Sequence, residues 1–176
     1  PRLRLWLLLI ASYYFYTANN HWLIILIVIS TQIDYVAGCV IGRTNRPEVR
    51  KLAMVASMVS NLALLGTFKY FNFFASTLVG MANLFGIRLD WVDLNIVLPV
   101  GISFYTFQSM SYTIDVYRRE IPYEPSWYRF AFYVAFFPQL IAGPIVRAAD
   151  FLPQIPLRPQ IDRAAVEHSL YLIMRG

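Results

Sequence analysis

Long apolar runs separated by short charged segments dominate the pattern of this chain. Two arginines precede an apolar run over residues 5–16, which ends in the polar and aromatic turn 19–22. The next run, Trp22 to Ile41, has about 20 residues and could cross the hydrocarbon of a bilayer as a helix. The pattern therefore predicts a helical hairpin in a membrane. The first run also fits a signal peptide, although no small-x-small cleavage site follows it cleanly.

The third apolar run is too long for one straight crossing. It extends from Leu52 to Ile87 with a single charge, at Lys69. As one helix it would measure about 54 Å, whereas the hydrocarbon layer is about 30 Å thick. We therefore predict that it breaks or bends at Lys69 to Asn72, with one crossing before this point and an interfacial or re-entrant helix after it. The Lys69 ammonium is expected to snorkel to the interface.

Two later runs contain residues that interrupt helices. Leu94 to Ile114 is uncharged and predicts a helix that ends at the charged segment 115–119. Phe130 to Val146 is broken by Pro138, Gly143 and Pro144. Helix breakers at membrane depth persist only where protein or a water-filled cavity satisfies the freed backbone groups, so this run is a predicted re-entrant segment. A proline-rich connector then leads to a helix that begins at about Arg163.

The composition supports a membrane protein. Hydrophobic residues make up 58% of the chain and charged residues 14%, whereas soluble domains carry about 25% charged residues. The net charge of +5 comes from Lys and Arg in loops, without the basic helix face of a nucleic-acid-binding protein. We therefore predict the lipid bilayer and not nucleic acid as a partner. The predicted fold class is all-α: a polytopic integral membrane helix bundle with broken or re-entrant segments.

The positive charges also predict a topology. Arg43 to Lys51 holds four positive residues against one acidic residue, Glu48, and Arg118 to Glu120 follows a later apolar run. The positive-inside rule places both segments in the cytoplasm. From the span lengths, Asn19 to Trp22 then lies on the opposite side of the membrane.

Polar residues form a stripe on the predicted helix from Leu94 to Ile114. They are spaced by four, three, four and three, so they share one face that should turn away from lipid. This face could serve packing between helices or form the wall of a substrate or acyl tunnel, and the sequence leaves both readings open. The stripe consists of Gly101, Tyr105, Gln108, Tyr112 and Asp115.

Three further residues extend this candidate substrate-binding set. Gln139, Gly143 and Arg147 are spaced by four in the broken segment. An arginine at the mouth of a broken helix can contact an anion or a lipid headgroup, or it can simply belong to a satisfied loop. Both readings of Arg147 stay open at this point.

The remaining reactive residues do not form an active site in the sequence. Asp34 is an intramembrane carboxylate, for which a salt bridge to the basic loop at Gly42–Arg43 is favoured over a functional site. His21 and His168 have no nucleophile or carboxylate partner at a useful spacing, so we interpret them as interfacial polar residues. Cys39 is interpreted as a packing residue, and no metal-ligand spacing is present. We therefore predict no catalytic residue within this chain.

Three sequence strings together resemble a known family. They are Lys69-Tyr70-Phe71-Asn72-Phe73-Phe74, then Leu98 to Gln108 continuing to Tyr112-Thr113-Ile114-Asp115-Val116-Tyr117-Arg118, and Phe136 to Arg147. In this order and spacing the chain resembles the N-terminal part of a bacterial membrane-bound O-acyltransferase of the alginate O-acetyltransferase subgroup. The resemblance covers nearly the whole chain.

The resemblance implies a multi-pass enzyme of the bacterial cytoplasmic (inner) membrane. Such an enzyme moves an acyl group, usually acetyl, from acetyl-CoA or another activated acyl carrier to a hydroxyl of an extracytoplasmic polysaccharide such as alginate, often through a partner acyl-accepting protein. No bound cofactor is implied. The family's catalytic histidine lies further along, in a Trp-His-Gly-like motif that residues 1–176 lack.

Residues 1–176 are therefore expected to form the N-terminal part of one multi-pass acyltransferase domain, a fragment without its catalytic part. The chain begins at Pro1 and ends at Gly176 within a helical pattern, which fits this expectation. The alternative is a segment of a membrane transporter or channel. In that reading the discontinuous helices and Asp34 would serve the passage of an ion or solute.

Overall fold

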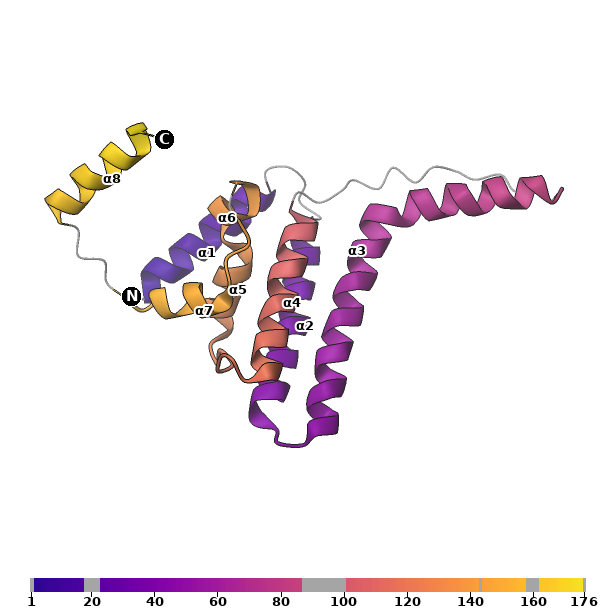
Figure 1. Ribbon diagram of the computed structural model, residues 1–176, viewed down its shortest axis with the longest axis horizontal. Helices are drawn as coiled ribbons and strands as arrows, with labels where there is room; N and C mark the ends of the chain where they lie inside the picture. The colour runs from indigo at the N-terminus through magenta and orange to yellow at the C-terminus, as the bar shows by residue number, and fades with distance from the viewer. Residues whose placement is uncertain (1, 18–22, 87–100, 143, 158–161, 176) are drawn as a thin grey trace.

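A computed structural model describes residues 2–17, 23–86, 101–142, 144–157 and 162–175 of the chain (Figure 1). Every regular element in these ranges is helical, as the apolar pattern predicts. The elements are α1 (Arg2–Thr17), α2 (Leu23–Arg43), α3 (Pro47–Leu84), α4 (Ile102–Arg118), α5 (Trp127–Ala135), α6 (Phe137–Ala142), α7 (Ala148–Phe151), the 3₁₀ turn η1 (Leu152–Gln154) and α8 (Arg163–Arg175).

Three helices form the centre of the bundle. α2, the N-terminal part of α3 and α4 each pack against the other two, and α1 lies beside α5 and α6 as a second group (Figure 1). α2 and α3 are long and apolar enough to cross a membrane. Their outward faces expose large apolar side chains such as Ile25, Ile29, Leu52 and Val59. This combination is typical of helices that face lipid, and the chain is a polytopic membrane protein.

α3 decides between the two predicted possibilities, a break or a bend. It does not break, because it is one helix of 38 residues, or about 57 Å. The segment Lys69 to Asn72 contains no proline or glycine, so nothing there removes a backbone donor. The helix bends instead, and its second arm leaves the bundle sideways (Figure 1). Its buried residues, Arg50, Ser57, Asn61 and Leu65, all precede Lys69, which is itself exposed.

The broken segment predicted from the prolines is present. α5 ends at Ala135, Phe136 takes an extended conformation, and α6 begins at Phe137. Pro138 therefore occupies the first turn of a new helix, where its missing N–H would have no helical partner in any case. α4 begins at Ile102 behind Gly101, whose φ of 77° lies in the left-handed region. The earlier part of the predicted helix, up to residue 100, lies outside the described residues.

Two glycines of α2 allow α4 and the loop after it to approach closely. A Cβ atom on Gly38 would lie 2.8 Å from Cε1 of Tyr112, and a Cβ on Gly42 would overlap the Tyr123 side chain. Gly38 and Gly42 are four residues apart, so they lie on one face of α2. Small residues at such a spacing let membrane helices pack at short range.

Arg50 ties together the ends of the central helices. Its guanidinium donates to the carbonyl of Ile41 in the last turn of α2 at 3.1 Å, and to those of Val116 and Tyr117 in the last turn of α4 at 3.5 and 2.6 Å. These carbonyls belong to the groups that a helix end leaves without partners. The side chain is 8% exposed. Arg50, in the first turn of α3, therefore supplies hydrogen-bond donors to the C-terminal ends of both α2 and α4.

The environment of Asp34 corrects the predicted salt bridge to the basic loop. Asp34 is fully buried, and its Oδ1 accepts from Ser57 Oγ at 2.5 Å and from Asn61 Nδ2 at 2.7 Å. Asn61 Oδ1 in turn accepts from Ser30 Oγ at 2.8 Å. The α2–α3 hairpin places Asp34 against the polar face of α3, so these bonds form inside the helix pair and not at its end. Two polar residues four apart in an apolar span, Ser57 and Asn61, were the sequence signal for this network.

The same end of the bundle gathers both segments predicted to be cytoplasmic. Arg43 Nε donates to Tyr123 Oη at 3.4 Å and its guanidinium lies 5.7 Å from the centre of the Tyr123 ring. The α2–α3 turn and the loop after α4 therefore lie on one side of the membrane, as the topology requires. Residues 19–22 lie outside the described residues, and the assignment of this side to the cytoplasm stays a prediction.

The tight contact at Gly42 gives a test of this packing. Gly42→Ala should destabilise the full-length protein by about 1–3 kcal/mol, because the added Cβ forces Tyr123 and its loop to move. Gly66→Ala is the matched control, since a Cβ there meets nothing within 4 Å. Alanine favours a helix over glycine by up to about 1 kcal/mol, so the control should be neutral or stabilising. Thermal unfolding in detergent measures both, and equal melting temperatures would contradict the close approach.

Candidate functional site

The polar stripe of α4 faces the protein interior, as its spacing predicts. Tyr105, Gln108, Tyr112 and Asp115 are all buried, whereas Phe107 on the other side of the helix is 49% exposed. Gly101 lies at the N-cap of α4, just before the helix. Since an unpartnered polar group in lipid costs a few kcal/mol, this orientation follows from solvation.

Gln108 joins α4 to α5 at the centre of the stripe. Its Nε2 donates to the carbonyl of Tyr133 at 2.8 Å. Tyr133 Oη in turn donates to the carbonyl of Val146 at 3.1 Å. The Oε1 of Gln108 is buried and has no hydrogen-bond partner among the described residues. The stripe thus contributes to packing and also retains an unused acceptor.

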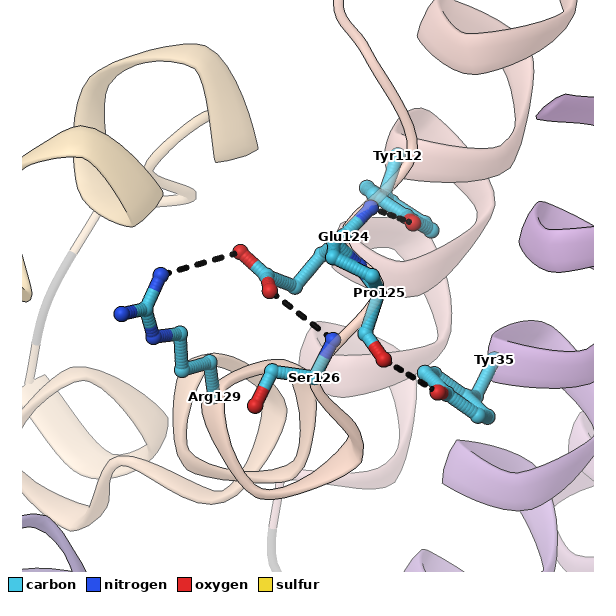
Figure 2. Close-up of polar contacts among 6 residues, drawn as sticks. All are labelled: Tyr35, Tyr112, Glu124, Pro125, Ser126 and Arg129. Carbon is cyan, nitrogen blue, oxygen red and sulfur yellow. Dashed lines mark hydrogen bonds and ion pairs between the residues drawn. The ribbon is translucent and has the colours of Figure 1, made fainter. Parts of the chain in front are cut away.

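Tyr112 holds the loop that precedes α5 (Figure 2). Its Oη accepts from the backbone N–H of Glu124 at 3.0 Å, and Tyr35 Oη donates to the carbonyl of Pro125 at 2.7 Å. The Glu124 carboxylate accepts from the N–H of Ser126 at 2.9 Å and lies 4.0 Å from Arg129. Sequence reasoning missed Glu124 and Arg129, because their partners come from a turn whose shape the pattern does not reveal. These bonds give Tyr112 a structural role.

α6 brings Gln139 to the start of α4. A Cβ on Gly101 would lie 3.3 Å from the carbonyl oxygen of Leu140, so the two segments are in direct contact. Gln139 is 5% exposed, and neither its Oε1 nor its Nε2 has a partner among the described residues. Gly143, the next predicted residue, lies outside the described residues. Gly101 therefore lies against α6, the helix that carries Gln139, so these two residues of the predicted substrate-binding set are close together.

Asp115 and Arg147 approach each other near the other end of α4. Burial raises the pKa of the Asp115 carboxyl, and the charge of Glu120 raises it further, whereas the positive charges of Arg147 and Arg118 lower it. Arg147 itself is exposed at the N-cap of α7. Asp115 is therefore a buried carboxyl that feels the positive charge of an exposed arginine.

The predicted set extends over too great a length for a single pocket. Gly101 and Asp115 are 14 residues apart, which is about 21 Å along a helix. Two described cavities, of about 370 and 450 Å³, are lined by other residues. The set therefore forms a column along α4, with Gly101 and Gln139 near one end and Asp115 and Arg147 near the other.

The described part of the chain contains no group of three or more residues suited to hold a metal ion. His168 is exposed on α8, while His21 lies outside the described residues. Cys39 is half-buried and free.

Comparison with known proteins identifies the relatives of this chain. It is 42% identical over 154 residues to a probable alginate O-acetylase of Pseudomonas aeruginosa, and 40% identical over 154 residues to one of Azotobacter vinelandii. It is also 31% identical over 175 residues to a peptidoglycan O-acetyltransferase of Helicobacter pylori. These matches cover 87%, 87% and 86% of this chain but only 29%, 31% and 32% of the relatives, so the chain spans about a third of their length.

No family model matches the chain, and no solved structure matches it. The chain is nevertheless similar, over 86–87% of its length, to alginate O-acetylases and to a peptidoglycan O-acetyltransferase, and this similarity supports its resemblance to the membrane-bound O-acyltransferase family.

Proposed function

We propose that this chain is part of an enzyme of the bacterial inner membrane that transfers an acyl group to a hydroxyl of an extracytoplasmic polysaccharide. The favoured acyl group is acetyl. The observation that carries the proposal is the shared chemistry of its relatives. Their names give alginate as the substrate of one group and peptidoglycan as the substrate of another, and both are polysaccharides that receive O-acetyl groups. The chemistry common to both groups supports O-acyl transfer to a sugar hydroxyl.

The chain supplies scaffold in this proposal, and the proton transfer occurs elsewhere. Acyl transfer to a hydroxyl needs a general base within hydrogen-bond reach of that hydroxyl. His168 is exposed on α8 and is not part of the buried stripe. We therefore propose that residues 1–176 are the N-terminal part of one multi-pass domain and that the base belongs to another part of it.

The stripe and α6 are proposed to border the path of the acyl group. An ester or thioester carbonyl needs a donor, and a sugar hydroxyl needs an acceptor, and an amide side chain offers both. Gln139 has a buried amide without a partner in the described chain, next to the start of α4. Burial also limits water there, which protects an activated acyl group from hydrolysis.

The donor and any acceptor protein follow from the same chemistry. The acyl group must arrive in activated form, as acetyl-CoA or on another acyl carrier. A polysaccharide outside the cytoplasm requires the group to cross the membrane or to pass to a partner protein. The relatives favour this enzyme over the transporter or channel that the broken helices alone would allow.

The full-length protein should transfer labelled acetyl groups to polysaccharide. In proteoliposomes supplied with a labelled acetyl donor on the cytoplasmic side, we expect ester-linked label on added alginate or peptidoglycan strands. The measurement is label released by mild base, because esters hydrolyse readily. Solute flux without any ester-linked label would contradict the proposal and favour a transporter.

Gln139 allows function and packing to be separated. Gln139→Met keeps the length of the side chain and removes an amide that has no partner in the described chain, so stability should be unchanged or raised. If the amide faces the acyl path, transfer should fall by about tenfold or more, which corresponds to one lost hydrogen bond of about 1.4 kcal/mol in the transition state.

Gln108→Met is the control for Gln139→Met. It removes the bond from Nε2 to the Tyr133 carbonyl and should lower the melting temperature. Wild-type transfer by a stable Gln139→Met protein would show that Gln139 only packs.

The histidines of this chain should be dispensable. His21→Ala and His168→Ala in the full-length enzyme should each change turnover by less than about tenfold, whereas loss of a true general base lowers it by about 10²–10⁴-fold. Steady-state transfer assays measure this, with the amount of folded protein as the control. A loss in the larger range at either residue would place the general base within this chain.

A further inference from the structure

A cavity lies at the end of the bundle where the α2–α3 turn meets the loop after α4. Its volume is about 450 Å³, within the range of about 300–1,000 Å³ that is usual for ligand sites. It is lined by Gly42, Asn45, Arg50, Val116 and the segment 119–123. None of these residues belongs to the stripe or to α6, so the cavity is separate from the proposed acyl path.

The cavity lies at the depth of lipid headgroups. α2 can cross the membrane and ends at Arg43, and α3, the other candidate span, begins at Pro47. Gly42 and Asn45 lie at the turn between these spans, so the cavity opens where the hydrocarbon ends. Phosphate groups of lipids are concentrated in this layer.

Positive charge at the cavity is left unpaired. Three N–H groups of the Arg50 guanidinium are bonded to carbonyls, which neutralise none of its charge. Arg119 also lines the cavity, and among the described residues its guanidinium has no hydrogen bond or ion pair. Glu120 is the acidic residue of the lining, and its carboxylate lies 3.8 Å from Arg118. The charge available to a ligand is therefore positive.

Arg119 adopts a left-handed backbone conformation, which is unfavourable for residues other than glycine. It ends α4 with a φ of 63°, and it is the one residue besides glycine with a positive φ in the described chain. The N–H of Glu120 bonds to the carbonyl of Asp115 at 2.9 Å, which completes a helix end that usually has glycine at this position. A side chain held in a strained conformation beside a cavity suggests that the side chain itself is needed.

We propose that this cavity binds the headgroup of an anionic phospholipid, with Arg119 as the main contact to its phosphodiester. Arg50 adds a second positive charge to the lining, and Asn45 and Tyr123 offer polar groups to the headgroup. Val116, Ile121 and Pro122 provide apolar walls for the start of the lipid chains. These apolar walls and the depth of the cavity favour a lipid over a soluble phosphate. The inference does not depend on the acyl-transfer activity.

The proposal is tested by lipid binding to the purified full-length protein. Native mass spectrometry and thermal unfolding are followed while phosphatidylglycerol or phosphatidylcholine is added to the detergent-solubilised protein. Arg119→Gly should weaken phosphatidylglycerol binding by about fivefold or more, because one basic contact at the membrane surface is lost. Without lipid this variant should melt at or above the wild-type temperature, because glycine relieves the strained φ. Arg119→Lys should retain most of the binding.

Lys51→Ala is the matched control, since it removes an exposed positive charge of the same basic end, outside the cavity lining and without uncovering Glu120. It should bind phosphatidylglycerol within about twofold of wild type, because the cavity itself is unchanged. Equal losses in Lys51→Ala and Arg119→Gly would show general surface charge and overturn the site. Protection by inorganic phosphate or coenzyme A equal to that by phosphatidylglycerol would overturn the lipid as ligand, and unchanged binding in Arg119→Gly would overturn the proposal.

Discussion

The guanidinium of Arg50 joins the ends of helices that would otherwise leave carbonyl groups without donors. A helix end in water can rely on the solvent, but at the edge of a bilayer a buried carbonyl needs a partner from the protein. Arg50 supplies donors to the last turns of α2 and α4 from the first turn of α3. Because an arginine stays charged and offers five donors, it can hold both ends at once. The positions of the basic turn and of the cavity beside it depend on this contact.

The same constraint explains the polar residues in the middle of the bundle. Asp34 Oδ1 accepts from Ser57 and Asn61 across the α2–α3 pair, and Gln108 donates across the α4–α5 pair. Such bonds hold the helices in one register, because a slip of one residue would leave buried polar groups unpaired. Gly38 and Gly42 fix the packing sterically. Because they have no side chains, aromatic rings from α4 and from the loop after it can lie directly against α2.

Gln139 on α6 differs from these residues. It is 5% exposed, and neither atom of its amide has a partner within the described chain, whereas Asp34 and Gln108 each leave only one side-chain oxygen unbonded. A buried amide without a partner is costly, so it is expected to meet a ligand or another part of the protein. The chain spans about a third of the length of its relatives, so in the proposed enzyme such a partner can come from another part of the protein. Its place at a proline-containing helix beside Gly101 makes it the residue of the predicted set that best fits an acyl path.

The sequence by itself determined the helical fold, the membrane environment and the buried face of α4. Run length, charge position and a spacing of three and four are properties of one helix, and they hold whatever that helix packs against. Only the tertiary structure decided that Asp34 bonds to α3 and not to the basic loop, that α3 bends without a break, and that Arg119 lines a cavity with a strained backbone. These features depend on how closely helices approach, and the volumes of side chains from distant segments set that distance.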